Sequence, residues 1–145
     1  MPKKISTFAL ALAAGSLLVA GASAQAKPRP TPEERLAKTL EGRVAGKPVD
    51  CIYLPRVTSS YIVDKTAIVY DAGSTIWVNR PASGAAALDD NDIMLTTPFG
   101  AQLCNVDIVR LIDRNAGFWR GSVSLGQFVP YTKAPNPGAK DEKAG

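Results

Sequence analysis

Two short runs of β-branched and aromatic residues lie close together in the chain, Thr66–Tyr70 and Ser74–Asn79, and only Asp71-Ala72-Gly73 separates them. Residues of this kind favour strands, and a three-residue connection that contains glycine is typical of a β-hairpin. Both faces of each run carry apolar side chains, so we predict that the hairpin lies in the centre of a sheet. Because side chains alternate across a strand, the two faces are Ile68 with Tyr70 against Ala67 with Val69, and Ile76 with Val78 against Trp77 with Asn79.

The rest of the chain carries weaker strand signals. The apolar pattern of Val106–Asp113 fits a helix or a strand, and we favour a strand because β-branched residues dominate it. Phe118–Gly126 is interpreted as a loop because glycines recur in it. Pro130 has no backbone N–H to donate, which predicts an edge position for the last strand. The other predicted strands are Val49–Leu54, Ser60–Val63, Ile93–Thr97 and Gln127–Tyr131.

One short helix is predicted before these strands. Thr31 can cap a helix whose first residue is Pro32, and Glu34 completes a capping box. Gly42 is a natural end. The predicted helix therefore covers Pro32–Glu41.

Together these elements indicate one small, mainly β domain. We expect an antiparallel sheet or a barrel-like arrangement, with one short N-terminal helix and a single disulfide. The expected organisation is a signal peptide at residues 1–24, a leader with the helix at 25–48, the β-rich domain at 49–131 and a disordered tail at 132–145.

The first 24 residues have the order of parts found in a secretory signal peptide. Lys3 and Lys4 form a cationic start, residues 8–20 are mostly apolar, and Ala22-Ser23-Ala24 is a small-residue cleavage site. A membrane-spanning helix needs ~20 apolar residues, so an uncleaved anchor is the less favoured alternative. Cleavage is expected after Ala24, with cleavage after Ala26 as the alternative. We therefore expect a periplasmic or secreted protein with no membrane anchor after processing.

Cys51 and Cys104 are the only cysteines. An even number of cysteines in an exported chain predicts a disulfide. Closing a loop of this length stabilises a fold by about 4 kcal/mol in the chain-entropy treatment. A catalytic thiol pair is the alternative, but the C-x-x-C spacing of such pairs is missing. A structural disulfide is therefore expected.

The chain contains no histidine. This excludes the Ser-His-Asp and Cys-His catalytic sets as they are usually built, and also histidine-ligated metal sites. We predict no catalytic residues, no metal site and no cofactor. Residues 50–131 hold six Arg or Lys and eight Asp, so the basic excess lies in the ends of the chain and no nucleic-acid partner is expected.

Asp89, Asp90 and Asp92 form an acidic cluster. A glycosidase needs two carboxyl groups about 5 to 9 Å apart, one of them with a raised pKa, and we expect nothing in a surface loop to raise a pKa. An EF-hand loop needs glycine at its sixth position and glutamate at its twelfth, and neither is present when the count starts at Asp89 or Asp90. A solvated turn is therefore the favoured interpretation, with a weak calcium contact as the alternative.

Four residues are candidate ligand contacts. Arg56 and Arg80 follow strand ends and could hold an anionic group, although arginines in such places more often form ordinary surface ion pairs. Trp119 and Arg120, together with Phe118, suit a stacking platform for sugars or aromatic ligands. The alternative, which we favour, is that Phe118 and Trp119 cover the open end of a small core.

The domain also carries a set of short motifs: a C-I start followed by strands, a strand that ends V-N-R, an L-C-x-x-D segment and a terminal G-x-F-x-P. They lie in Asp50–Ile52, Thr66–Tyr70, Ile76–Arg80, Leu103–Asp107 and Leu125–Tyr131. Over most of Val49–Tyr131 the chain resembles an uncharacterised exported family of proteobacteria. The resemblance implies that Cys51 and Cys104 correspond to the paired cysteines of that family, and it implies no catalytic residue.

These observations favour a non-enzymatic binding or accessory protein of the periplasm or the cell exterior. Its partner would be an envelope protein or a small molecule, which the sequence does not identify. The alternative is an enzyme, or an enzyme inhibitor, that acts on a cell-envelope polymer through the acidic loop or the Arg and Trp residues. A self-assembling structural protein that pairs open strand edges is a further alternative.

Overall fold

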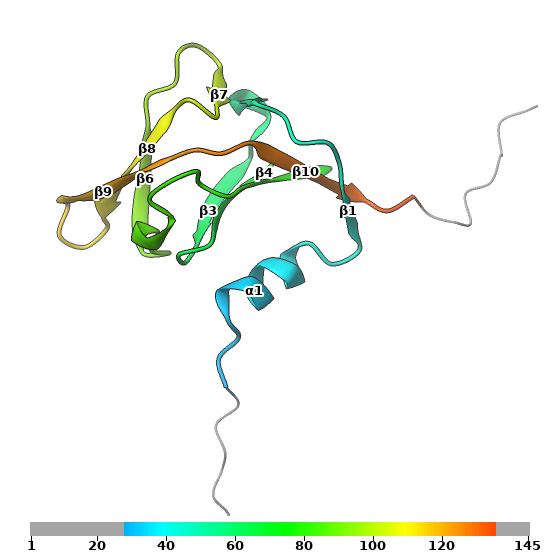
Figure 1. The fold of residues 1–145 in the computed structure, drawn as a ribbon, viewed down its shortest axis with the longest axis horizontal. Helices are drawn as coiled ribbons and strands as arrows, with labels where there is room; N and C mark the ends of the chain where they lie inside the picture. Colours follow the sequence, from blue (N-terminus) through cyan, green and yellow to red (C-terminus); the bar gives the residue numbers. More distant parts are fainter. Residues whose placement is uncertain (1–27, 136–145) are drawn as a thin grey trace, which may run out of the picture.

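The computed structural model describes residues 28–135, so the predicted signal peptide lies outside the described residues. Within them the fold is mainly β, with one helix and three antiparallel sheets (Figure 1). The sheets do not close into a barrel, so the antiparallel alternative is confirmed and the barrel-like one is wrong. The largest sheet has five strands in the order β1 (Arg43–Ala45), β10 (Phe128–Lys133), β5 (Thr75–Asn79), β4 (Ala67–Asp71) and β3 (Ser59–Val63). A two-stranded ribbon is formed by β2 (Cys51–Tyr53) and β7 (Gln102–Cys104). A three-stranded sheet has the order β6 (Asp92–Thr96), β8 (Ile108–Asp113) and β9 (Trp119–Ser124).

The predicted hairpin is confirmed as β4 and β5, and it lies inside the five-stranded sheet. Its two apolar faces contact different parts of the core. One face, with Ile68 and Tyr70, packs against residues of the other two sheets. The opposite face, with Val69 and Val78, packs beneath the helix α1 (Pro32–Thr39). The five-stranded sheet is therefore the middle layer of the domain.

The helix α1 begins as predicted and ends two residues earlier than predicted. Thr31 and Glu34 form the capping box, with the Glu34 N–H donating to Thr31 Oγ1 and the Thr31 N–H donating to the Glu34 side chain. Leu36 is its one fully buried side chain and anchors the helix to the sheet. Gly42 adopts a positive φ of 71° at the turn that follows, which glycine tolerates at no steric cost.

The predicted edge position of the last strand, β10, is wrong. It lies between β1 and β5, with Pro130 opposite Trp77. The Pro130 carbonyl accepts from the Gly46 N–H at 2.7 Å. The N–H and C=O of one strand residue point to the same side, so the donor that proline lacks would face β1, which ends at Ala45. Pro130 therefore leaves the ladder to β5 intact.

Three strands were not predicted. Residues 43–45 were placed in the leader and form β1, residues 102–104 were assigned to no element and form β7, and residues 118–126 were placed in a loop and contain β9. Residues 132 and 133 extend β10, so the predicted start of the tail at 132 is also wrong, while residues 136–145 lie outside the described residues. The predicted strand at Val49–Leu54 is shorter in the structure: Leu54 begins a 3-10 turn, η1 (Leu54–Arg56).

The ambiguous segment after Asn105 is a strand, β8, as favoured. The predicted disulfide between Cys51 and Cys104 is present. The two cysteines lie directly opposite each other on β2 and β7, and the next pair in register, Ile52 and Leu103, is buried in the core. The disulfide therefore cross-links the two strands of the ribbon formed by β2 and β7, and the apolar pair packs this ribbon into the core with Ile68 and Tyr70 of the five-stranded sheet.

A buried asparagine closes the loop between β9 and β10. The Asn79 side chain is fully buried, its Nδ2 donates to the Gly126 carbonyl at 2.6 Å, and its Oδ1 accepts from the Gly126 N–H at 3.0 Å. A Cβ at Gly126 would collide with the Arg80 carbonyl oxygen. The close approach of the Arg80 carbonyl therefore requires glycine at position 126. Among residues 28–135, no helix is long and apolar enough to span a membrane.

Candidate functional site

The three-stranded sheet has one face in the core and one face toward solvent. Val109, Leu111 and Val123 point inward and are fully buried. The opposite positions form two rows in register across the three strands. One row contains Ile93, Ile112 and Trp119, and the other contains Leu95, Arg110 and Ser122. We call these six residues, together with Ile108 at the start of β8, the outer face.

The outer face is unusually apolar for a solvent-facing sheet. Trp119 is 65% exposed, Ile108 56% and Leu95 49%. Two open hollows of about 480 and 420 Å³ lie on this face and share Leu95, Arg110 and Trp119. Single exposed apolar residues are ordinary on a monomer, but a contiguous apolar patch marks a site of interaction.

Arg110 is the one charged side chain in these rows. It lies in the middle strand, flanked in register by Leu95 and Ser122. In residues 28–135 no ion pair includes Arg110. The outer face therefore offers a guanidinium group that is in no ion pair and lies among Leu95, Ile108 and Trp119, with Asp107 and Ser122 bordering the same hollow.

A β-bulge separates Trp119 from Arg120. The register shifts between Leu111 and Ile112 of β8, so that β9 has one extra residue at this point. A bulge turns the side chains next to it. Trp119 is on the outer face, where its Nε1 donates to the Gly121 carbonyl at 2.7 Å, whereas Arg120 contacts acidic residues. The two predicted ligand contacts therefore do not form one site.

The favoured interpretation of Phe118 and Trp119 as covers of the core is wrong, because both are more than half exposed. β9 is an edge strand of its sheet, and Trp119 borders the open hollows on the solvent-facing side of that sheet. Of the two roles considered for these aromatics, an exposed surface for a ligand or partner is the one compatible with their positions.

Arg120 holds two carboxylates of the acidic loop. Its Nη1 lies 3.0 Å from Asp89 Oδ2 and 3.3 Å from Asp92 Oδ1. The Asp92 side chain is fully buried, and its Oδ2 has no hydrogen-bond partner in the described residues. Burial raises the pKa of Asp92, against the opposing effect of Arg120. The expectation that nothing raises a pKa in this loop is therefore wrong, because β6 begins at Asp92 and draws it inward.

Asp89 has the opposite shift. The backbone N–H of Asn91 donates to its carboxylate at 3.0 Å, and this bond, together with Arg120, lowers the pKa of Asp89. Acid–base catalysis by a carboxyl pair requires two such groups with divergent pKa values. It also requires that the protonated member reach the substrate, and the Asp92 side chain has no exposed surface.

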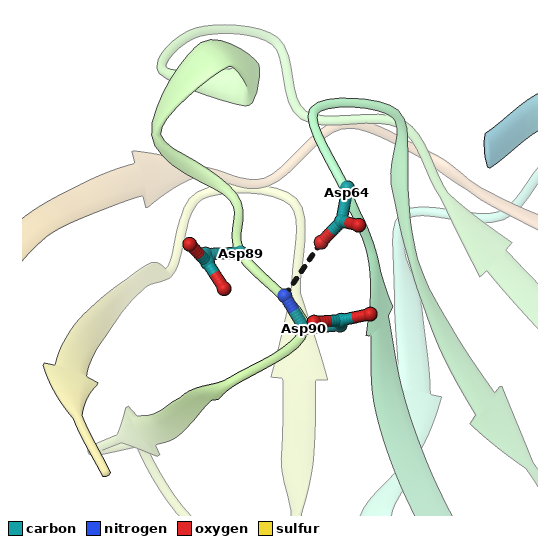
Figure 2. A group of neighbouring side chains, drawn as sticks. All are labelled: Asp64, Asp89 and Asp90. Carbon is teal, nitrogen blue, oxygen red and sulfur yellow. Dashed lines mark hydrogen bonds between the residues drawn. The ribbon is translucent and has the colours of Figure 1, made fainter. Parts of the chain in front are cut away.

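The acidic loop also meets the turn after β3, where Asp64 joins it (Figure 2). Carboxylate oxygens of Asp64, Asp89 and Asp90 lie within 4.8 Å of one another, which suits a hard cation. The Asp64 carboxylate instead accepts from the Asp90 backbone N–H at 2.6 Å, and Arg35 of α1 contacts Asp64 and Asp90 at 2.7 and 3.1 Å. Each carboxylate of this cluster is therefore already in contact with an arginine, and Arg35 ties α1 to the loop.

The two remaining predicted contacts lie apart from the outer face. Arg80 forms two hydrogen bonds to Glu33 at 2.8 and 2.9 Å, and this hydrogen bonding lowers the pKa of Glu33. Arg80 is therefore in a surface ion pair that ties β5 to the start of α1. Arg56, in η1, borders a separate cleft together with Tyr53 and Trp77.

Sequence reasoning identified Trp119 but missed Arg110 and the aliphatic residues of the outer face. A signal for them exists in β8, whose run Ile108 to Ile112 is apolar on both faces apart from Arg110. An antiparallel strand with one solvated face normally alternates apolar with polar residues. A strand that breaks this alternation is buried on both faces or contacts a partner.

No protein-family model, curated protein or solved structure matches this chain. The resemblance to an exported proteobacterial family therefore stays a prediction, and function is argued from the geometry alone.

Proposed function

We propose that this chain is an exported, non-enzymatic binding protein that presents the outer face of its β6–β8–β9 sheet to a protein partner. The observation that carries the proposal is Arg110, which is in no ion pair of the described residues and lies within an exposed, largely apolar surface. Tryptophan and arginine are enriched among the residues that dominate the energy of protein interfaces. The outer face combines both with aliphatic side chains.

The chemistry of the face specifies its partner. Apolar side chains of the partner would cover Leu95, Ile108 and Trp119, and a carboxylate would meet Arg110. Covering Arg110 with an uncharged surface would bury a charge without compensation, which is costly. The partner is therefore a protein segment in which apolar side chains flank a single acidic residue.

Export is supported by two features. The N-terminal residues 1–24 have the composition of a signal peptide, and the disulfide is of the kind that forms and persists in oxidising compartments. The intact mass of the protein purified from its host without reductant tests this part. We expect a chain that begins at Gln25 and lacks two hydrogens; an uncleaved chain with free thiols would contradict export.

A non-enzymatic role is supported by the absence of histidine and by the burial of Asp92. The acidic loop has one carboxyl group with a raised pKa and one with a lowered pKa, but the group with the raised pKa has no exposed surface. The charges of the loop are used to hold α1, β6 and β9 together.

The proposal is tested by selecting peptides from a random display library on the folded, oxidised protein. We expect the selected peptides to share one Asp or Glu flanked by apolar residues. Arg110→Gln and Trp119→Ala should each weaken peptide binding about tenfold or more, the loss expected for an interface anchor. Arg56→Gln, which changes an exposed arginine outside the face, should leave it unchanged.

Two outcomes would overturn the proposal. Selected peptides without an acidic residue, or peptides that bind the Arg110→Gln protein equally well, would refute the role of Arg110. Sedimentation equilibrium of the purified protein tests whether a second copy of the chain covers the outer face. A dimer that Trp119→Ala dissociates would show that a second copy of the chain, rather than a different protein, covers the outer face.

A further inference from the structure

A second cleft lies between the disulfide-bonded ribbon and the turn of the central hairpin. It has a volume of about 370 Å³, within the range of small-molecule sites. Tyr53 and Gln102 of the ribbon, Arg56 of η1, and Ser74, Thr75 and Trp77 from the β4–β5 hairpin line it. From this set we propose that the cleft binds a cyclic, hydroxylated ligand that carries a carboxylate on its ring, that is, one unit of an acidic sugar.

Two aromatic side chains of different elements line the cleft. Trp77 lies in the central strand, between Tyr70 and Pro130 in register, and its inner side packs against the core. Tyr53 comes from β2 and is half exposed. Aromatic surfaces with a few polar groups among them are the usual composition of a small-molecule site. Here they provide surfaces for the apolar face of a sugar ring.

Arg56 supplies the charge. Among residues 28–135 no ion pair includes it, in contrast to Arg80 and Arg120. Its backbone is fixed, because the Leu54 N–H donates to the Ala101 carbonyl at 3.0 Å and the Val57 N–H closes the turn on Leu54 at 2.9 Å. A guanidinium group presents a planar set of donors that matches a carboxylate.

Uncharged polar groups complete the cleft. The Gln102 amide and the hydroxyls of Ser74 and Thr75 offer both donors and acceptors, which is the requirement for binding ring hydroxyls. An inorganic anion would use the arginine and leave the aromatic surfaces without a role. The combination therefore favours a ring that carries both hydroxyls and a carboxylate.

The disulfide determines where two of these residues lie. Cys51 pairs with Cys104 and, two residues further along each strand, Tyr53 pairs with Gln102. Residues two apart in a strand share a face, so the disulfide and the Tyr53–Gln102 pair lie on the same side of the ribbon. Breaking the disulfide should therefore weaken ligand binding even where the domain stays folded.

The chain contains two tryptophans, which makes the cleft directly observable. In a Trp119→Phe background, Trp77 is the only tryptophan and its fluorescence reports on the cleft. Digalacturonate is the acidic probe and galactobiose its neutral counterpart. We expect a saturable change with digalacturonate and at least tenfold weaker binding of galactobiose.

The variants separate the cleft from other surfaces. Arg56→Gln should weaken digalacturonate binding at least tenfold and remove the preference over galactobiose, with an unchanged circular dichroism spectrum. Arg114→Gln, which removes an exposed arginine outside the cleft, should have no effect. Trp119 is replaced in every sample, so the result does not depend on the role proposed for the outer face.

Three outcomes would overturn the inference. Trp77 fluorescence that responds to neither sugar would show that the cleft is not a sugar site. Equal affinity for both sugars, or an unchanged preference in Arg56→Gln, would refute the role of the arginine. Tighter binding of adenosine monophosphate than of digalacturonate would assign the cleft to a nucleotide instead.

Discussion

The structure determines the effect of removing the disulfide on the free energy of unfolding better than the effect of any other change. Cys51 and Cys104 are 53 residues apart in the sequence, so their bond closes a loop of about half the described chain. Cross-linking such a loop lowers the entropy of the unfolded chain by an amount worth about 4 kcal/mol at 25 °C. The double variant Cys51→Ala/Cys104→Ala should lose that amount from its free energy of unfolding.

The same variant should still fold. Ile52 and Leu103, next to the cysteines, are buried in the core and continue to anchor the ribbon. A domain of this size has a free energy of unfolding of roughly 5–15 kcal/mol, which a loss of about 4 kcal/mol does not exhaust.

Equilibrium urea unfolding, followed by tryptophan fluorescence and circular dichroism, measures the difference. Wild-type protein reduced with dithiothreitol is the control and should match the double variant. A loss below about 1 kcal/mol would refute the reasoning, because it would mean that the cross-link does not constrain the unfolded chain.

Three further changes are predicted, each with its own measurement. Gly126→Ala should lower the free energy of unfolding by about 1–3 kcal/mol, because the new Cβ collides with the Arg80 carbonyl, whereas Gly121→Ala, whose Cβ would lie 3.7 Å from the nearest side chain, should cost less; equal urea midpoints would contradict this. Leu36→Ala should cost about 2–5 kcal/mol and speed amide exchange in α1, because it empties the only fully buried position of the helix; unchanged exchange would mean that other contacts dock α1. Asp92→Asn removes a carboxyl group whose folded-state pKa is raised, so the wild-type protein loses stability as pH rises above the ordinary pKa of 3.8, and the variant does not lose this contribution. Urea unfolding at several pH values from 3.5 to 7 should therefore show the free energy of unfolding of the variant rising relative to that of the wild type. A difference between the two proteins that stays constant with pH would contradict the raised pKa.

Local signals were sufficient to predict the elements that local chemistry determines. The β4–β5 hairpin has a glycine in its turn and β-branched residues on both sides, and the start of α1 has a complete capping box. The cysteine pair was predictable because a chain with two cysteines has one intramolecular pairing. Each of these features depends on residues close in sequence or on a count.

The elements that were missed depend on distant partners. β9 contains Gly121 and two serines and has little strand propensity of its own, so its pairing with β8 determines its conformation. β10 can lie between two strands because β1 is only three residues long and ends at Ala45. Beyond that point β1 needs no hydrogen bond from the backbone N–H that Pro130 lacks. Asp92 looked like a loop residue because its burial comes from the start of β6.

The candidate site was predictable only in part. Trp119 was identified from its sequence neighbourhood, but the grouping with Arg120 was wrong because a β-bulge turns the two apart. Strand pairing brings Arg110 next to Leu95 and Trp119, although these residues are far apart in the sequence.

The most direct test of the outer face is a double-mutant cycle with one peptide selected on the protein. The cycle combines Arg110→Gln with replacement of the peptide's acidic residue by its amide, and isothermal titration calorimetry measures the four dissociation constants. If the carboxylate meets Arg110, each single change weakens binding and the double change adds little, which gives a coupling free energy of about 1 kcal/mol or more. Effects that simply add, with no coupling between the two changes, would contradict the central claim that this face recognises an acidic residue within an apolar segment.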